Sequence, residues 1–110
     1  MRFVLVALVL ASVVHAGELP ADAQLYADRC SGCHGDGGGG DGPAAAALIP
    51  KPRNFHDAAF WHDRSLDQVK TVVTKGKPGT MMPGFEGVLT EAEIDAVARF
   101  VRRFDPGAAK

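Results

Sequence analysis

The clearest periodic pattern in the chain lies between Thr90 and Phe104. Apolar residues recur there at helical spacing, which predicts an amphipathic helix with one buried face. The apolar positions are Ile94, Val97, Ala98, Phe100, Val101 and Phe104. Thr90 and Glu93 have the spacing of a capping box, and the run Asp105-Pro106-Gly107 ends the pattern.

A second helix is predicted to begin after Ser65, which forms a capping-box pair with Gln68. Leu66, Val69, Val72 and Val73 follow with helical spacing, and Gly76 is expected to end this helix. Short helical turns are expected over 44–48 and 58–61.

The first helix is predicted to begin near Pro20, to carry Leu25 and Tyr26 on its apolar side, and to continue to Gly35. The segment Gly35–Pro43 is mostly glycine and therefore predicts a loop. A flexible linker between two domains is the alternative, but the remaining chain is short for a second core. With no strand pair and no internal repeat, the sequence predicts an all-α domain with three to five helices.

The segment Met1–Ala16 has the features of a secretory signal peptide: Arg2, an apolar run over 3–14, and small residues at the end. The run is shorter than the roughly 20 residues that a membrane span needs, which favours a cleaved signal peptide; a retained anchor is the alternative. We expect cleavage before Gly17, a domain over 17–110 without a membrane span, and a periplasmic location.

The composition excludes a nucleic-acid-binding footprint, because 12 basic and 13 acidic residues leave a net charge of −1 in 110 residues. A domain of this size buries little surface and often needs a covalent staple or a cofactor.

The motif Cys30-Ser31-Gly32-Cys33-His34 is the strongest chemical signal. Its spacing places two thiols and one imidazole on one side of a helical turn, where the thiols can add to haem vinyl groups and His34 can bind the iron. This pentapeptide is typical of c-type haem attachment. Alternatives are a disulfide, a thioredoxin-like redox pair, and a zinc site that adds two of His34, His56 and His62.

The second axial position is assigned to Met82, in an irregular stretch that Pro83 stiffens. A thioether opposite a histidine raises the reduction potential of haem. The alternatives are Met81, a bis-histidine haem using His56 or His62, and methionines that only fill the core.

Residues near the predicted haem are expected to support it. The Gly42-Pro43 segment is placed to accept the ring N–H of His34. The polar groups of Arg53, Asn54 and Trp61 are candidates for hydrogen bonds to the haem propionates.

With these motifs in place, the chain resembles a class I cytochrome c of bacterial periplasmic type. The resemblance rests on Cys30–His34, Gly42-Pro43, the run Met82-Pro83-Gly84-Phe85, and the last helix. It implies a small helical fold around one haem c, with Tyr26 and Phe100 packed where the first and last helices cross. It also implies His34 as proximal ligand, Met82 as distal ligand and the Pro43 carbonyl as partner of His34.

The predicted function is a one-electron carrier that is not itself an enzyme. It would exchange electrons with a donor and an acceptor protein, as a monomer or in a weak complex. Two alternatives stay open: an electron-entry subunit of a larger periplasmic redox enzyme or oxidase, since one fold serves both roles, and a haem-based sensor in which Met82 leaves the iron.

Overall fold

The structure is a computed structural model in which residues 3–4, 6–8 and 19–108 are described. The predicted signal peptide, Met1–Ala16, and its cleavage site lie mostly outside these residues, so both remain predictions.

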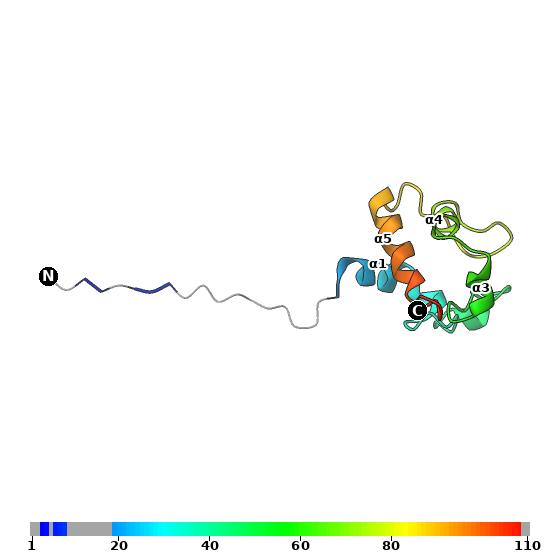
Figure 1. Cartoon of the computed structure of the whole chain (residues 1–110), viewed down its shortest axis with the longest axis horizontal. Coiled ribbons are helices and arrows are strands. Elements are labelled where there is room, and N and C mark those ends of the chain that lie inside the picture. The colour runs from blue at the N-terminus through cyan, green and yellow to red at the C-terminus, as the bar shows by residue number, and fades with distance from the viewer. Residues whose placement is uncertain (1–2, 5, 9–18, 109–110) are drawn as a thin grey trace.

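Five α-helices and one short 3-10 helix make up the described part of the chain, which contains no strand (Figure 1). The elements in chain order are α1 (Ala21–Arg29), α2 (Ser31–His34), η1 (Ala45–Ala47), α3 (Ala58–His62), α4 (Leu66–Lys75) and α5 (Glu91–Arg102). The predicted all-α fold is confirmed.

Helices α4 and α5 begin and end largely where the sequence indicates. Ser65 and Thr90 each form the predicted capping box, so that both helix starts have their first amides satisfied. Gly76 ends α4 at φ +76°, a backbone conformation that favours glycine. Helix α5 ends at Arg102, so Phe104 lies in the turn after the helix rather than within it.

The prediction of one continuous first helix is wrong, because the helix is interrupted at Cys30. Its backbone angles, φ −123° and ψ −37°, separate α1 from α2. The hydroxyl of Ser31 donates to the carbonyl of Ala27 at 2.7 Å, a back-bonding pattern that bends helices. The break gives the Cys30–His34 segment its own short helical turn, which ends at Gly35 (φ +84°).

The core forms where α5 packs against both α1 and α4 (Figure 1). Tyr26 of α1 lies against Phe100 of α5, with ring centroids 5.0 Å apart, as the family resemblance implies. Arg103 and Asp22 form an ion pair at 2.9 Å that joins the end of α5 to α1. The buried apolar residues are Tyr26, Ala45, Phe55, Phe60, Trp61, Val69, Val73, Phe85, Leu89, Ile94, Val97, Ala98 and Val101.

An ion-pair network links α4 to α5 on the outer side of the core. Lys70 and Arg99 both reach the carboxylate of Asp95. Hydrogen bonds from Lys70, and then from Arg99, hold the pKa of Asp95 below its usual value.

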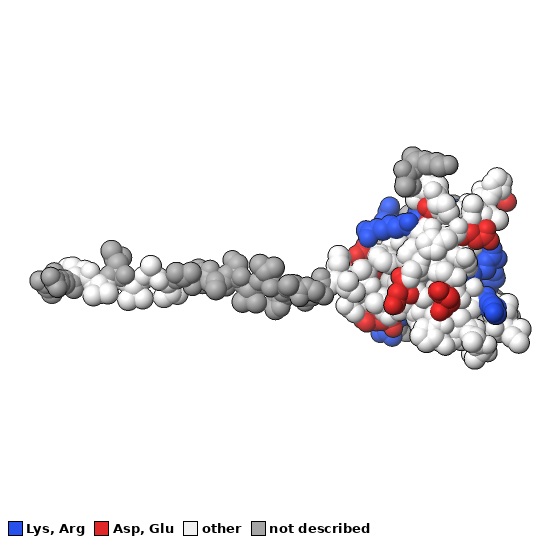
Figure 2. Space-filling view, turned by 90° about the horizontal axis from the view of Figure 1, so that it is seen from below, with Lys and Arg blue, Asp and Glu red and all other residues white. Residues whose placement is uncertain are grey.

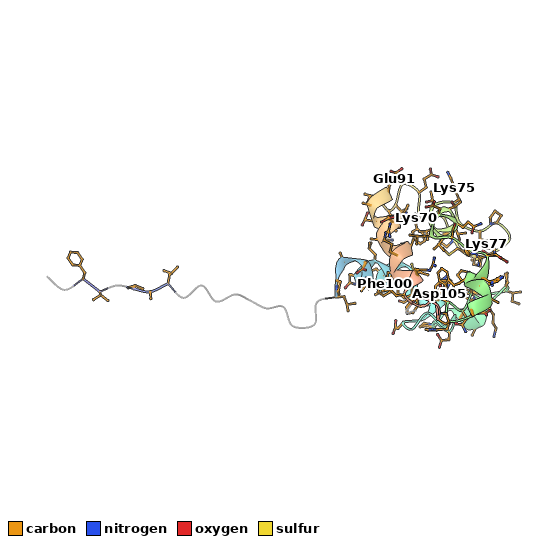
Figure 3. All side chains as sticks on the ribbon, viewed as in Figure 1. Lys70, Lys75, Lys77, Glu91, Phe100 and Asp105 are labelled. Atoms are coloured by element: carbon orange, nitrogen blue, oxygen red, sulfur yellow. The ribbon has the colours of Figure 1, made fainter. Side chains whose placement is uncertain are left out.

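Figure 3 shows Lys75 and Lys77 near the end of α4 and Glu91 at the start of α5.

The surface carries both signs of charge. Figure 2 shows acidic and basic side chains interspersed over one face of the folded part. Such a surface suits weak, local electrostatic contacts rather than binding to a polyanion.

Replacement of Val97 by alanine tests the central place of α5 in the core. Val97 is 0 % exposed, so loss of its two methyl groups is expected to lower the free energy of unfolding by about 2 kcal/mol. Guanidinium denaturation of the haem-loaded protein measures this change. The matched control is Val88→Ala, at a position 56 % exposed, which is expected to change stability little. Equal losses in both variants would contradict the described packing.

Candidate functional site

The two thiols of the site lie at the start and within the short helix α2. Cys30 and Cys33 are both half-buried and neither forms a disulfide in the structure. Burial, followed by the proximity of Cys33, raises the pKa of the Cys30 thiol to about 11. The thiol of Cys30 is therefore protonated at neutral pH and is not poised as a redox-active thiolate.

The glycine-rich loop closes directly onto the backbone of α2. The amides of Gly40, Gly42 and Ala44 donate to the carbonyls of His34, Cys33 and Gly32, at 2.8, 3.0 and 2.9 Å. A Cβ atom on Gly42 would lie 2.5 Å from the carbonyl oxygens of Ser31 and Gly32, so only glycine fits there. The loop thus belongs to the same domain as α2, and the two-domain linker alternative is wrong.

His34 is held by the segment that follows Pro52. Its Nδ1 donates to the carbonyl of Arg53 at 3.2 Å, because a carbonyl only accepts. Burial lowers the pKa of His34, and the hydrogen bond to Arg53 opposes this shift. A neutral ring with its proton on Nδ1 leaves Nε2 with a lone pair for a metal ion.

The Pro43 carbonyl was predicted as the partner of His34, and the structure instead pairs this ring with Arg53. The physical reason is that the Gly42–Ala44 backbone is turned towards α2, where its amides serve the α2 carbonyls. Pro43 itself is exposed.

Met82 lies in a loop that the end of α4 holds in place. The amide of Lys77 donates to the carbonyl of Met82 at 3.2 Å, and the amide of Phe85 donates to Val73 at 2.8 Å. A Cβ atom on Gly76 would lie 2.8 Å from the carbonyl oxygen of Met82, so the two segments are in close contact.

The two adjacent methionines have different environments. Met82 is half-buried and packs against the hydrophobic core, whereas Met81 is 71 % exposed. The interpretation that both methionines fill the core is therefore wrong for Met81. Met82 is the thioether that the fold directs inward.

The three residues predicted to bind propionates have different surroundings. Arg53 is exposed and its guanidinium lies 5.1 Å from the Phe60 ring centroid, and Asn54 accepts a hydrogen bond from the amide of His56. Trp61 is buried, and its single N–H donates to the carbonyl of Phe55 at 2.7 Å. The predicted hydrogen bond from Trp61 to a propionate is wrong for this structure, because its only donor is already used.

The other histidines do not complete a metal site. His56 is exposed and its Nε2 donates to the carbonyl of Gly37, and the exposed His62 lies near Asp63. Within the described ranges, no three His, Cys, Asp or Glu side chains gather into a set that could hold a metal ion. The zinc alternative therefore has no support from the described residues.

Two residues near the site were missed by sequence reasoning. The Phe55 ring stacks on His34, with centroids 4.5 Å apart and planes 17° apart. The Arg64 guanidinium lies 4.1 Å from the Phe60 ring centroid, on the ring that Arg53 also approaches. The only sequence signal for Phe55 was an aromatic residue directly after the Arg53-Asn54 pair.

An open cleft of about 530 Å³ lies beside the glycine-rich loop rather than at the thiols. Its lining includes Ser31, Asp36, Asp41 and His56, but not Cys30, Cys33, His34 or Met82. We therefore do not regard this cleft as the functional site.

The donor set fits a covalently attached haem. Two half-buried thiols outside any disulfide flank one turn, the neutral imidazole of His34 has a free Nε2, and a half-buried thioether lies against the same core. An imidazole and a thioether are the iron ligands of cytochromes c, and two cysteines in a C-x-x-C-H motif attach the haem covalently. Among the described residues, no helix is long and apolar enough to cross a membrane.

Known proteins that are similar to this chain point to one family. The model of the family described as cytochrome c oxidase, cbb3-type, subunit III matches residues 17–101. The chain is 35 % identical over 100 residues to dihydro-heme d1 dehydrogenase of Pseudomonas aeruginosa, covering 90 % of this chain but only 18 % of that protein.

Two further relatives are nearer to this chain in size. Cytochrome c55X of Stutzerimonas stutzeri is 34 % identical over 95 residues, covering 84 % of this chain and 73 % of the relative. The solved structure of the KustC0563 c-type cytochrome superposes with a TM-score of 0.64 at 29 % identity, covering 76 % of this chain and 96 % of that one. With the motif, the helical fold and the family match in agreement, the chain belongs to the c-type cytochromes and carries a covalently bound haem c.

Proposed function

We propose that this chain is an exported one-electron carrier with a haem c attached at Cys30 and Cys33 and with His34 and Met82 as axial ligands. The observation that supports it best is the contrast between the half-buried Met82 and the exposed Met81. This contrast favours Met82 over Met81 as the thioether partner of the His34 imidazole.

The residues of the site divide the work of holding the cofactor. Cys30 and Cys33 would hold the haem through thioether bonds, each formed by addition of the S–H group across one vinyl group with no leaving group. His34 donates through Nε2, while its Nδ1–H stays bound to the carbonyl of Arg53. Arg53 and Asn54 remain our candidates for the propionates, because both residues are exposed and both side chains carry N–H donors.

Two filled axial positions determine the type of chemistry. The bound haem supplies one-electron exchange between ferric and ferrous iron, and its potential is raised by Met/His ligation. With His34 and Met82 both bound, no coordination position would remain for a substrate. The expected role is therefore electron transfer between docked redox proteins rather than catalysis by this domain, and the mixed surface charge suits weak docking.

Export follows from the segment Met1–Ala16, whose pattern is that of a secretory signal peptide. We propose that it is removed and that the domain 17–110 acts in the periplasm, as a monomer or in a weak complex.

A second candidate function is an electron-entry module of a larger redox enzyme. It is favoured by the similarity to a dehydrogenase of which this chain spans only 18 %. Size measurement of the native protein from the periplasm separates the two. A single-chain mass supports the free carrier, whereas a stable stoichiometric complex with a redox enzyme would contradict it.

Replacement of Met82 tests the proposed ligation. In Met82→Ala, the sulfur-to-iron charge-transfer band of the ferric protein is expected to disappear, the potential to fall, and the ferrous iron to bind carbon monoxide at neutral pH. Visible and near-infrared spectroscopy measures the band. Met81→Ala is the matched control and is expected to keep the band.

Retention of the band in Met82→Ala would contradict the assignment of this ligand. Rapid carbon monoxide binding by the unmutated ferrous protein would instead favour the haem-based sensor.

A further inference from the structure

The segment Arg53–Phe55 surrounds one side of the His34 ring. The Arg53 carbonyl accepts from Nδ1 at 3.2 Å, and the Phe55 ring lies nearly parallel to the imidazole with centroids 4.5 Å apart. The hydrogen bond at Nδ1 restrains the position of the imidazole ring. The stacked Phe55 ring restrains rotation of the imidazole plane. Together the two contacts fix the orientation of the imidazole plane.

Phe55 is itself fixed at both of its backbone polar groups. Its amide donates to the carbonyl of Gly38 at 2.8 Å, and its carbonyl accepts the buried N–H of Trp61 at 2.7 Å. The side chain is 7 % exposed, so it has little freedom to move away from His34.

Neighbouring rings close the remaining space around Phe55. Phe60 lies at 5.5 Å between centroids, and Trp61 and Phe104 each lie at 6.3 Å. Phe104 also covers Gly38, where an added Cβ atom would come within 2.6 Å of its ring. The position of the Phe55 ring is therefore set by the loop on one side and by aromatic packing on the other.

We propose that Phe55 is a positioning residue that sets the orientation of the His34 ring, and that Trp61 acts through the carbonyl of Phe55. This inference rests on the proposed role of His34 as an axial ligand. It replaces the predicted propionate contact of Trp61 with a structural link from Trp61 to Phe55 to His34.

The orientation of an axial imidazole has a spectroscopic consequence. Rotation of the ring about the bond from Nε2 to the metal changes which iron d orbital overlaps with the ligand π system. Residues around a ligand also change its basicity and hence the potential of the metal. Replacement of Phe55 is therefore expected to change the magnetic properties of the ferric protein while His34 stays bound.

The test compares Phe55→Leu with Phe100→Leu, each as haem-loaded protein. Phe100 packs on Tyr26 and Phe104 in the same core, but has no aromatic contact with His34 or with Phe55. In Phe55→Leu, we expect a changed electron paramagnetic resonance anisotropy, a changed order of the haem-methyl proton shifts, and a shifted reduction potential. Phe100→Leu is expected to lower thermal stability and to keep the unmutated magnetic pattern.

Trp61→Phe is a second variant that keeps an aromatic ring and removes only the N–H. It is expected to move the haem-methyl proton shifts in the same direction as Phe55→Leu does, by a smaller amount. If Trp61 instead bonded a propionate, the variant would change only the pH dependence of the potential and keep the methyl order. That outcome would overturn the proposed link, and it remains measurable if Phe55→Leu fails to fold.

The outcomes also separate this inference from the proposed function. If the unmutated protein shows the sulfur-to-iron band and Phe55→Leu keeps the unmutated magnetic pattern, the positioning role is wrong and the ligation stands. If the unmutated protein lacks that band, the proposed ligation itself fails.

Discussion

The close approach of the glycine-rich loop to α2 is the contact on which the rest of the site depends. Gly42 lies so near the carbonyls of Ser31 and Gly32 that no side chain fits between them. Two loop amides and the amide of Ala44 donate hydrogen bonds to the backbone of α2. The same loop accepts the amide of Phe55 through Gly38. The glycine-rich loop therefore holds both the turn that carries the thiols and the segment Arg53–Phe55 that contacts the His34 ring.

The helical core gives this arrangement its rigid frame. Helix α5 contacts α1, which leads directly into the Cys30–His34 turn, and α4, whose end holds the Met82 loop. His34 follows α1, and Met82 lies in the loop held by α4. Because α5 packs against both helices, it sets the positions of these two proposed ligands relative to each other. A small chain thus positions its ligands through one central helix.

Local patterns predicted much of this fold from the sequence. The capping boxes at Ser65 and Thr90 and the glycine at the end of α4 depend on nearby residues only, and all three were predicted correctly. The break at Cys30 was missed, because the sequence does not show that the Ser31 hydroxyl bonds Ala27 rather than water.

The residues around His34 were harder to predict than the motif itself. The residues of the Cys30–His34 motif are adjacent in the sequence and can be recognised there. The hydrogen-bond partner of His34, the carbonyl of Arg53, lies nineteen residues away. Trp61 was assigned to a propionate because an indole N–H is a good donor, and only the fold shows that Phe55 already uses it. Contacts between distant segments depend on how the loop closes, which composition alone does not specify.

Peptide mass mapping of protein matured in a periplasm tests whether Cys30 and Cys33 hold a haem covalently. We expect one haem mass added to the peptide that contains Cys30, Cys33 and His34, stable to denaturant and to reductant. An unmodified peptide, or one in which the two cysteines form a disulfide, would contradict it.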